Sequence, residues 1–107
     1  MRVLAIETSC DDTSVAIVEN GRRVLSNIIQ SQFEVHAPFG GVLPEAAARR
    51  HLENINHCVA QALLAAGSLS LTDIDLFAAT LGPGLVGSLL IGANVAKTLS
   101  LIAGKPF

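Results

Sequence analysis

The dipeptide Asn20-Gly21, set between two stretches of strand-like sequence, constrains the fold of this chain more than any other feature. Both residue types tolerate positive φ, which the tightest hairpin turns require, so the flanking segments 13–19 and 23–31 should pair as antiparallel strands. A nearly continuous apolar run at residues 2–6 is typical of one more, buried strand. We therefore expect a meander of three antiparallel strands.

A helix should follow the meander after a loop. Residues 33–43 contain turn residues and show no periodicity, which predicts a loop. Pro44 suits the first turn of a helix, where its missing N–H costs nothing, and Gly67 suits the position just past the end. One face of the predicted helix, residues 44–66, is apolar: Ala48, Leu52, Ile55, Val59, Ala62 and Ala66.

A short apolar strand at residues 76–81 leads into a second helix at residues 85–103. That helix is long enough for a membrane span, but Asn94 and Lys97 in its middle are costly at a bilayer centre. Small residues recur along it every fourth position, and such a seam lets another backbone approach closely: Gly84, Ser88, Gly92, Ala96, Ser100 and Gly104. We interpret the segment as a buried helix and expect no membrane association.

The order of these elements predicts the fold class. A three-strand antiparallel meander followed by helix, strand and helix is the α/β order of an actin-like ATPase (ribonuclease H-like) lobe without its later elements. The chain is 50% apolar and only 15% charged, where about 25% charged is ordinary. We therefore expect residues 1–107 to be one incomplete N-terminal lobe, with apolar surface left for a partner or for more chain to cover.

Polar residues gather between the first two predicted strands. The segment 7–14 reads ETSCDDTS, so Glu7, Ser9, Asp11 and Asp12 lie at a hairpin tip. Hydroxyl and backbone N–H groups can cradle phosphate oxygens there, and carboxylates can hold a divalent cation or its waters. A solvated turn explains the same composition, because Ser, Thr and Asp favour turns. Both interpretations stay open on these residues alone.

A second candidate lies between the fourth strand and the second helix. Gly82, Pro83 and Gly84 stand immediately before the helix N-terminus, where free N–H groups and the helix dipole stabilise an anion. The alternative is a loop that only ends the strand. We predict that this turn and the polar hairpin tip converge on one phosphate-sized gap.

Charge and thiol content narrow the classes of function further. The net charge is −2, and no basic stripe of the kind that binds nucleic acid strongly is present. Cys10 and Cys58 form no CxxC pair and no apolar leader follows Met1, so we expect a cytoplasmic protein with reduced thiols. Cys10 has no neighbouring base to activate it, and the three histidines share no metal-binding geometry. We expect no metal site among these residues.

Three stretches carry a resemblance to a known family: IETSCDDTS (6–14), HAPFGGVLPEAAARRH (36–51) and DIDLFAATLGPGLVGSLLIG (73–92), with ANVAKTLS (93–100) after them. In this order they resemble the N-terminal part of the TsaD/Gcp/Kae1 family, the tRNA threonylcarbamoyladenosine transferases formerly labelled O-sialoglycoprotein endopeptidases. The resemblance implies transfer of a threonylcarbamoyl group from threonylcarbamoyl-AMP to N6 of adenosine 37 in tRNA.

The resemblance also implies where the chemistry lies. Glu7, Ser9, Asp11 and Asp12 would line the nucleotide cleft, and the turn at 82–84 would border it; many relatives carry Glu where this chain has the shorter Asp12. The family binds one divalent metal, iron or zinc, and threonylcarbamoyl-AMP or ATP, but its HxxxH metal motif begins beyond Phe107. No catalytic residue is therefore assigned here, and we expect the 107 residues alone to be inactive.

Partners and alternatives follow from the same resemblance. The family works with TsaB-like and TsaE-like subunits and with tRNA, and its members pair through the two helices. We therefore expect this chain to form a homodimer through a set of helix residues: Leu52, Ile55, Val59, Gly84, Ser88, Gly92 and Ala96. A TsaB-like non-catalytic dimerisation partner and a lobe of a sugar or acetate kinase remain as alternatives, although a kinase would have a glycine in the segment 10–13.

Overall fold

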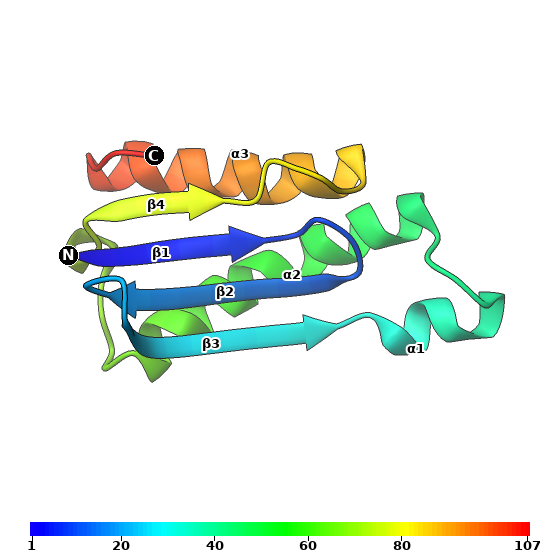
Figure 1. Cartoon of the computed structure of the whole chain (residues 1–107), viewed down its shortest axis with the longest axis horizontal. Coiled ribbons are helices and arrows are strands. Elements are labelled where there is room, and N and C mark those ends of the chain that lie inside the picture. Colours follow the sequence, from blue (N-terminus) through cyan, green and yellow to red (C-terminus); the bar gives the residue numbers. More distant parts are fainter.

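Four strands form one mixed sheet in the order β3-β2-β1-β4. In the computed structural model, which describes all 107 residues, the strands are β1 (Arg2–Glu7), β2 (Asp12–Glu19), β3 (Arg23–Ser31) and β4 (Leu76–Ala79). The first three make the predicted antiparallel meander, whereas β4 runs parallel to β1. Figure 1 shows that the β1–β2 turn and the segment after β4 lie at the same end of the sheet.

The hairpin and helix-end signals act as the sequence predicts. Asn20 and Gly21 adopt φ values of 53° and 68°, and they turn β2 into β3. Helix α2 (Pro44–Ala65) begins at the expected proline, and Gly67, with φ of 112°, follows its end. Helix α3 (Val86–Ala103) ends at Gly104 in the left-handed region.

The expectation of a loop at residues 33–43 is wrong in part, because helix α1 (Phe33–His36) and a 3-10 turn (Ala37–Phe39) occupy its first half. The cause is a local pair of buried side chains. The ring Nε2 of His36 lies 2.7 Å from Oε1 of Gln32, one helical turn earlier. Another 3-10 turn, Leu71–Asp73, was not predicted and is capped by the reciprocal hydrogen bonds of Ser70 and Asp73.

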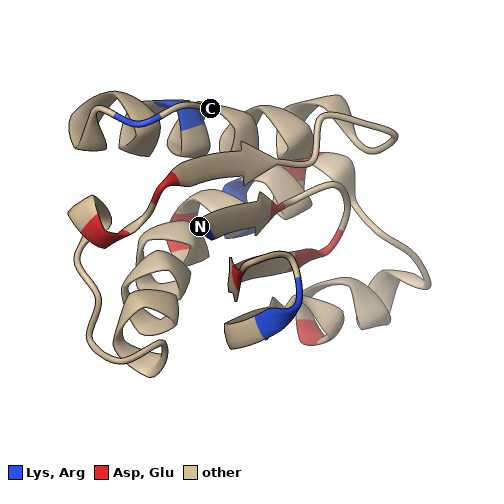
Figure 2. Cartoon of the chain, turned by 60° about the vertical axis from the view of Figure 1, so that its left-hand side comes forward, with Lys and Arg blue, Asp and Glu red and all other residues tan.

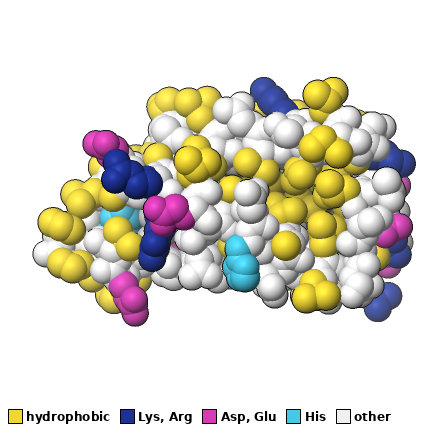
Figure 3. All heavy atoms as spheres, turned by 180° about the vertical axis from the view of Figure 1, so that it is seen from behind, with side chains coloured by type: hydrophobic (Ala, Val, Ile, Leu, Met, Phe, Trp, Pro, Cys, Tyr) yellow, Lys and Arg dark blue, Asp and Glu magenta, His cyan; other side chains and the backbone are white.

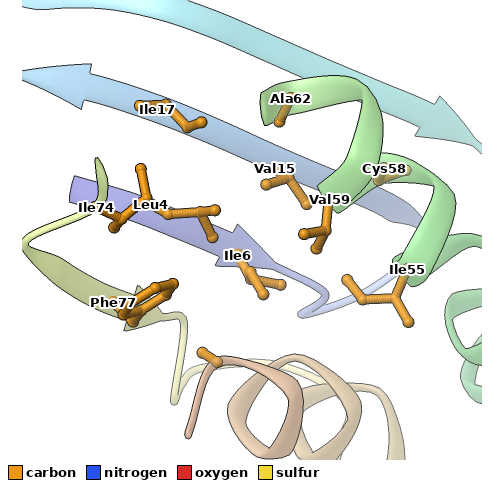
Figure 4. Close-up of a cluster of buried hydrophobic side chains, with 11 residues drawn as sticks. Leu4, Ile6, Val15, Ile17, Ile55, Cys58, Val59, Ala62, Ile74 and Phe77 are labelled. Carbon is orange, nitrogen blue, oxygen red and sulfur yellow. The ribbon is translucent and has the colours of Figure 1, made fainter. Parts of the chain in front are cut away.

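Both long helices cover the same face of the sheet, and the core lies between them and the strands. Figure 4 shows side chains of α2 directed at β1 and β2, with Phe77 of β4 beside them. The labelled residues are all buried: Leu4, Ile6, Val15, Ile17, Ile55, Cys58, Val59, Ala62, Ile74 and Phe77. Burial of these side chains supplies the main hydrophobic stabilisation of the fold.

The buried face of α2 is rotated from the predicted one. Leu52 was placed on the apolar face, yet it is 61% exposed, whereas His51 is completely buried. The residues of α2 that face the sheet are Ala47, His51, Ile55, Cys58, Val59 and Ala62. The difference arises because hydrogen bonds satisfy the ring of His51, so a polar residue can occupy a core position.

The small-residue seam of α3 allows a close approach, but the approaching segment is the end of β1 and Thr8, which follows it, in the same molecule. The Oγ1 of Thr8 donates to the backbone oxygen of Ser88 at 2.6 Å and accepts from the N–H of Gly92 at 3.0 Å. A Cβ on Gly92 would lie 2.5 Å from that hydroxyl oxygen. The four central residues of the seam therefore lie in the interior of the chain: Ser88, Gly92, Ala96 and Ser100.

This placement corrects the predicted homodimer surface. Five of its seven residues are buried inside the chain, where no second molecule can reach them: Ile55, Val59, Ser88, Gly92 and Ala96. Leu52 and Gly84 remain exposed. The error arises because a small-residue seam predicts close packing without saying which backbone approaches it.

The sequence predicts a buried helix at residues 85–103, but helix α3 is buried on one side only. By length and composition alone, the helix could cross a membrane. Within the chain, 28% of its residues, Val86–Ala103, are buried. Its outer side carries exposed apolar residues, among them Leu101 at 83% exposure. Figure 3, which views the molecule from behind, shows hydrophobic side chains gathered over the helical layer.

We predict that Gly92→Ala lowers the free energy of unfolding by about 1–3 kcal/mol, because the added methyl group collides with Thr8. The collision should outweigh the gain of about 1 kcal/mol that alanine brings to a helix. Urea unfolding followed by circular dichroism measures the change. The matched control is Gly87→Ala, whose Cβ would lie 3.6 Å from Ala48, an ordinary contact, and which should not destabilise the chain. Equal stability of the two variants would contradict this packing.

Candidate functional site

The two turns singled out by the sequence are in direct contact. The N–H of Leu85, the residue before α3, donates to the backbone oxygen of Ser9 at 2.8 Å. Gly84 lies so close to the same residue that a Cβ on it would be 2.6 Å from that oxygen. Only glycine can occupy position 84 without a shift of the backbone. The β1–β2 turn and the 82–84 turn thus form one continuous surface at the end of the sheet.

Glu7 and Ser9 hold each other. One carboxylate oxygen of Glu7 accepts from the N–H of Ser9 at 2.8 Å, and the other accepts from its hydroxyl at 2.9 Å. The sequence suggested that both side chains line a cleft as free polar groups. In the structure they instead fix the first residues of the turn, immediately beside the contact with Leu85.

His51 of α2 fixes the other half of the turn. Its Nε2 donates to the backbone oxygen of Cys10 at 2.9 Å, and its Nδ1 accepts from the hydroxyl of Thr13 at 2.8 Å. Because Cys10 and Thr13 flank Asp11 and Asp12, one buried ring holds both ends of the acidic tip. The sequence analysis does not predict this role. A usable signal is that His51 lies one helical turn before Ile55 and therefore on the same face of α2.

Asp11 and Asp12 are left without cationic partners. Neither takes part in any of the four ion pairs of the chain, and Asp12 is exposed. Figure 2 shows acidic residues at both ends of the β1–β2 loop. Free carboxylates repel a bare phosphate and attract a divalent cation that accompanies one.

Cys10 sits among these acids as a neutral thiol. Burial raises its pKa, and the neighbouring carboxylates, Asp11 above all, raise it further because they disfavour a thiolate. A nucleophilic cysteine needs the opposite environment. The surroundings of Cys10 therefore disfavour the thiolate that a nucleophile requires. No three His, Cys, Asp or Glu side chains of the chain come together as a metal site.

Backbone N–H groups at the start of α3 attract anions, whereas the acidic turn attracts cations. The first helical hydrogen bond runs from Leu89 to Leu85, so the N–H groups of Val86, Gly87 and Ser88 have no partner in the chain. Together with the helix dipole they favour an anion. The surface therefore combines anion-attracting N–H groups on one side with cation-attracting carboxylates on the other.

Most of the chain matches a family of known proteins. The model of the family described as "TsaD: tRNA N6-adenosine threonylcarbamoyltransferase" matches residues 23–107. The chain belongs to the TsaD family. A relative named tRNA N6-adenosine threonylcarbamoyltransferase in Kosmotoga olearia is 60% identical over 107 residues, which are all of this chain and 32% of that protein. One of the same name in Caldicellulosiruptor bescii is 58% identical over the same length.

The chain thus spans about a third of the length of these TsaD relatives, as the N-terminal portion that the sequence predicted. Among solved structures, YeaZ from Pseudomonas aeruginosa matches with a TM-score of 0.67 and 22% identity, covering 98% of this chain and 42% of that one. The likeness is one of fold. It confirms the predicted partial actin-like ATPase lobe.

We predict that His51→Ala lowers the free energy of unfolding by about 2–3 kcal/mol, because the oxygen of Cys10 and the hydroxyl of Thr13 lose their partner. Hydrogen exchange at residues 10–13 should also become faster. The control is His57→Ala on the exposed side of the same helix, which should change stability by no more than about 0.5 kcal/mol. Unchanged exchange at the tip in the His51 variant would show that the ring does not hold it.

Proposed function

We propose that this chain is the N-terminal part of a tRNA threonylcarbamoyltransferase, in which the β1–β2 turn and the 82–84 turn form one wall of the nucleotide site. The names of its TsaD relatives support the reaction. The main support for this site is the hydrogen bond from Leu85 to Ser9, because it joins the helix start, which attracts anions, to the acidic turn.

Each part of the wall has a task in this proposal. The free N–H groups of Val86 and Gly87, both exposed residues, receive phosphate oxygens of threonylcarbamoyl-AMP or ATP. Asp11 and Asp12 hold the waters or the cation that accompany the phosphate. Glu7 and His51 keep the turn in place and do not contact the ligand.

The divalent metal of the family, iron or zinc, does not fit the residues of this chain. No three His, Cys, Asp or Glu side chains, at the acidic tip or elsewhere in the chain, are placed so that they could hold a metal ion together. Its ligands must come from other residues of a complete transferase, and no step is assigned to the metal here. Because tRNA is the substrate in this proposal, we place the activity in the cytoplasm.

A chimera tests the proposed function. The 107 residues of this chain replace the matching segment of the Kosmotoga olearia relative, with which they share 60% identity. We expect the chimera to modify tRNA and the isolated 107 residues to modify none, with threonylcarbamoyladenosine detected by mass spectrometry. Asp11→Asn together with Asp12→Asn should weaken nucleotide binding, whereas Glu34→Gln, an acid outside the turn, should leave it unchanged. A chimera that folds but forms no threonylcarbamoyladenosine would contradict the proposal.

We also propose that the exposed apolar side of α3 is covered by a second copy of this chain. Apolar residues on that side lie where a partner can reach them: Val86, Leu90, Leu101 and Ile102. Exposed Asn94, Lys97 and Thr98 lie between the two pairs along the helix. Exposed apolar surface of this kind is typical of an interaction site. This surface, and not the buried small-residue seam, is the part of α3 that a partner can reach.

Light scattering tests self-association. At micromolar concentration we expect a dimer mass for the chain and a monomer mass for Leu90→Asp with Leu101→Asp. Val24→Asp, which adds a charge at an exposed apolar residue of β3, is the matched control and should remain dimeric. A monomer mass for the unchanged chain would exclude the homodimer.

A further inference from the structure

A hollow of about 370 Å³ opens beside the acidic turn. Except for Asp11, its lining residues lie outside the two turns of the candidate nucleotide site. Asp11 forms part of its wall, and the other walls come from α1 and the segment that follows it, including Phe33, Gly40 and Gly41. The hollow and the candidate nucleotide site therefore share one carboxylate. Its size falls within the roughly 300–1,000 Å³ of small-molecule sites.

The walls of this hollow are held by buried polar side chains. His36 is buried, and its two ring nitrogens bond to Oε1 of Gln32 and to the N–H of Leu43. Gln32 is buried in turn and donates to the backbone oxygen of Ala47 in α2. Gly40, with φ of 71°, allows the chain to turn back at the rim. The segment is thus tied to α2 through Gln32 and to the residue before α2 through His36.

The chemistry of the lining is selective. Phe33 is 72% exposed although it is a large aromatic residue, and it lines the hollow. A flat aromatic ring next to a carboxylate suits a planar ligand that carries N–H donors, because the ring can stack while the carboxylate accepts hydrogen bonds. No Lys or Arg lines the hollow, so a phosphate does not fit there.

We propose that this hollow receives the target nucleobase of the tRNA, an unpaired adenine whose amino group faces Asp11 and whose ring stacks on Phe33. The inference rests on the proposed function, since the tRNA acceptor is the adenosine N6 position in the names of the relatives. It divides the surface into two subsites that meet at Asp11. The nucleotide lies on the two turns, and the acceptor base lies in the hollow.

The adenine of the donor nucleotide offers the same chemistry, so the experiment must separate the two sources. In the chimera, Phe33→Ala should raise KM for tRNA by about 5- to 150-fold, the range that corresponds to the loss of one base–aromatic stack. The affinity for ATP or the adenylate, measured by calorimetry, should stay unchanged. Phe33→Tyr should restore KM for tRNA, because it keeps the stacking face.

Phe39 provides the matched control. It is 67% exposed and belongs to the same segment, yet it does not line the hollow, so Phe39→Ala should leave KM for tRNA unchanged. An unchanged KM in Phe33→Ala, or equal losses in both alanine variants, would overturn the inference. A loss confined to nucleotide affinity would assign the hollow to the donor and overturn it as well.

A second measurement keeps this inference separate from the failure of the proposed function. Filter binding with tRNA does not require turnover, so it can be carried out with a folded but inactive chimera. A photoreactive phenylalanine analogue at position 33 should crosslink to an adenosine of the tRNA, whereas the same analogue at position 39 should not. An inactive chimera that still shows this difference would contradict the reaction and support the base site. Absence of a position-33 crosslink would overturn the base site.

Discussion

The geometry of this chain depends on the contact between Thr8 and α3. One buried hydroxyl lies between the backbone oxygen of Ser88 and the N–H of Gly92, and the missing side chain of Gly92 makes room for it. This contact fixes the end of β1 against the second turn of α3. The next residue, Ser9, is then placed where Leu85 can donate to it. The juxtaposition of the two turns therefore follows from one close approach of strand and helix.

Helix α2 completes the arrangement from the other side. Its buried His51 bonds to the backbone on one side of the acidic pair and to a hydroxyl on the other. Glu7 contributes a third restraint through Ser9. As a result Asp11 and Asp12 project from a turn whose other residues are engaged, and the charge of the tip is carried by a well-positioned backbone. Polar groups that bind each other prepare the surface, and those that remain free give it its chemistry.

The local signals in the sequence predicted most of the fold, whereas the long-range ones did not. Asn20-Gly21, Pro44 and Gly67 act within a few residues of themselves, so each marked its turn or helix end correctly. The burial of His51 in place of Leu52 depends on partners 38 and 41 residues away, which no helical wheel contains. The α1 helix was missed because its cause is a side-chain pair and not periodicity. The sequence predicts that the two turns converge on a phosphate-sized gap, whereas in the structure they converge in direct contact. The mutual engagement of Glu7 and Ser9 was not predicted, because composition does not distinguish a free polar group from an occupied one.

The hydrogen bonds of Thr8 to α3 join residues that are 80 and 84 positions apart in the chain. Closing such long loops comes late in folding, since their entropy is lost before the contact is gained. Neither the hairpin nor either helix forms the candidate site by itself. The turn acquires its shape only when the sheet and both helices have docked, so a partly folded chain presents scattered acids and loose amides in place of a ligand-ready geometry. Competence to bind is in this sense a property of the finished tertiary structure and of no single motif within it.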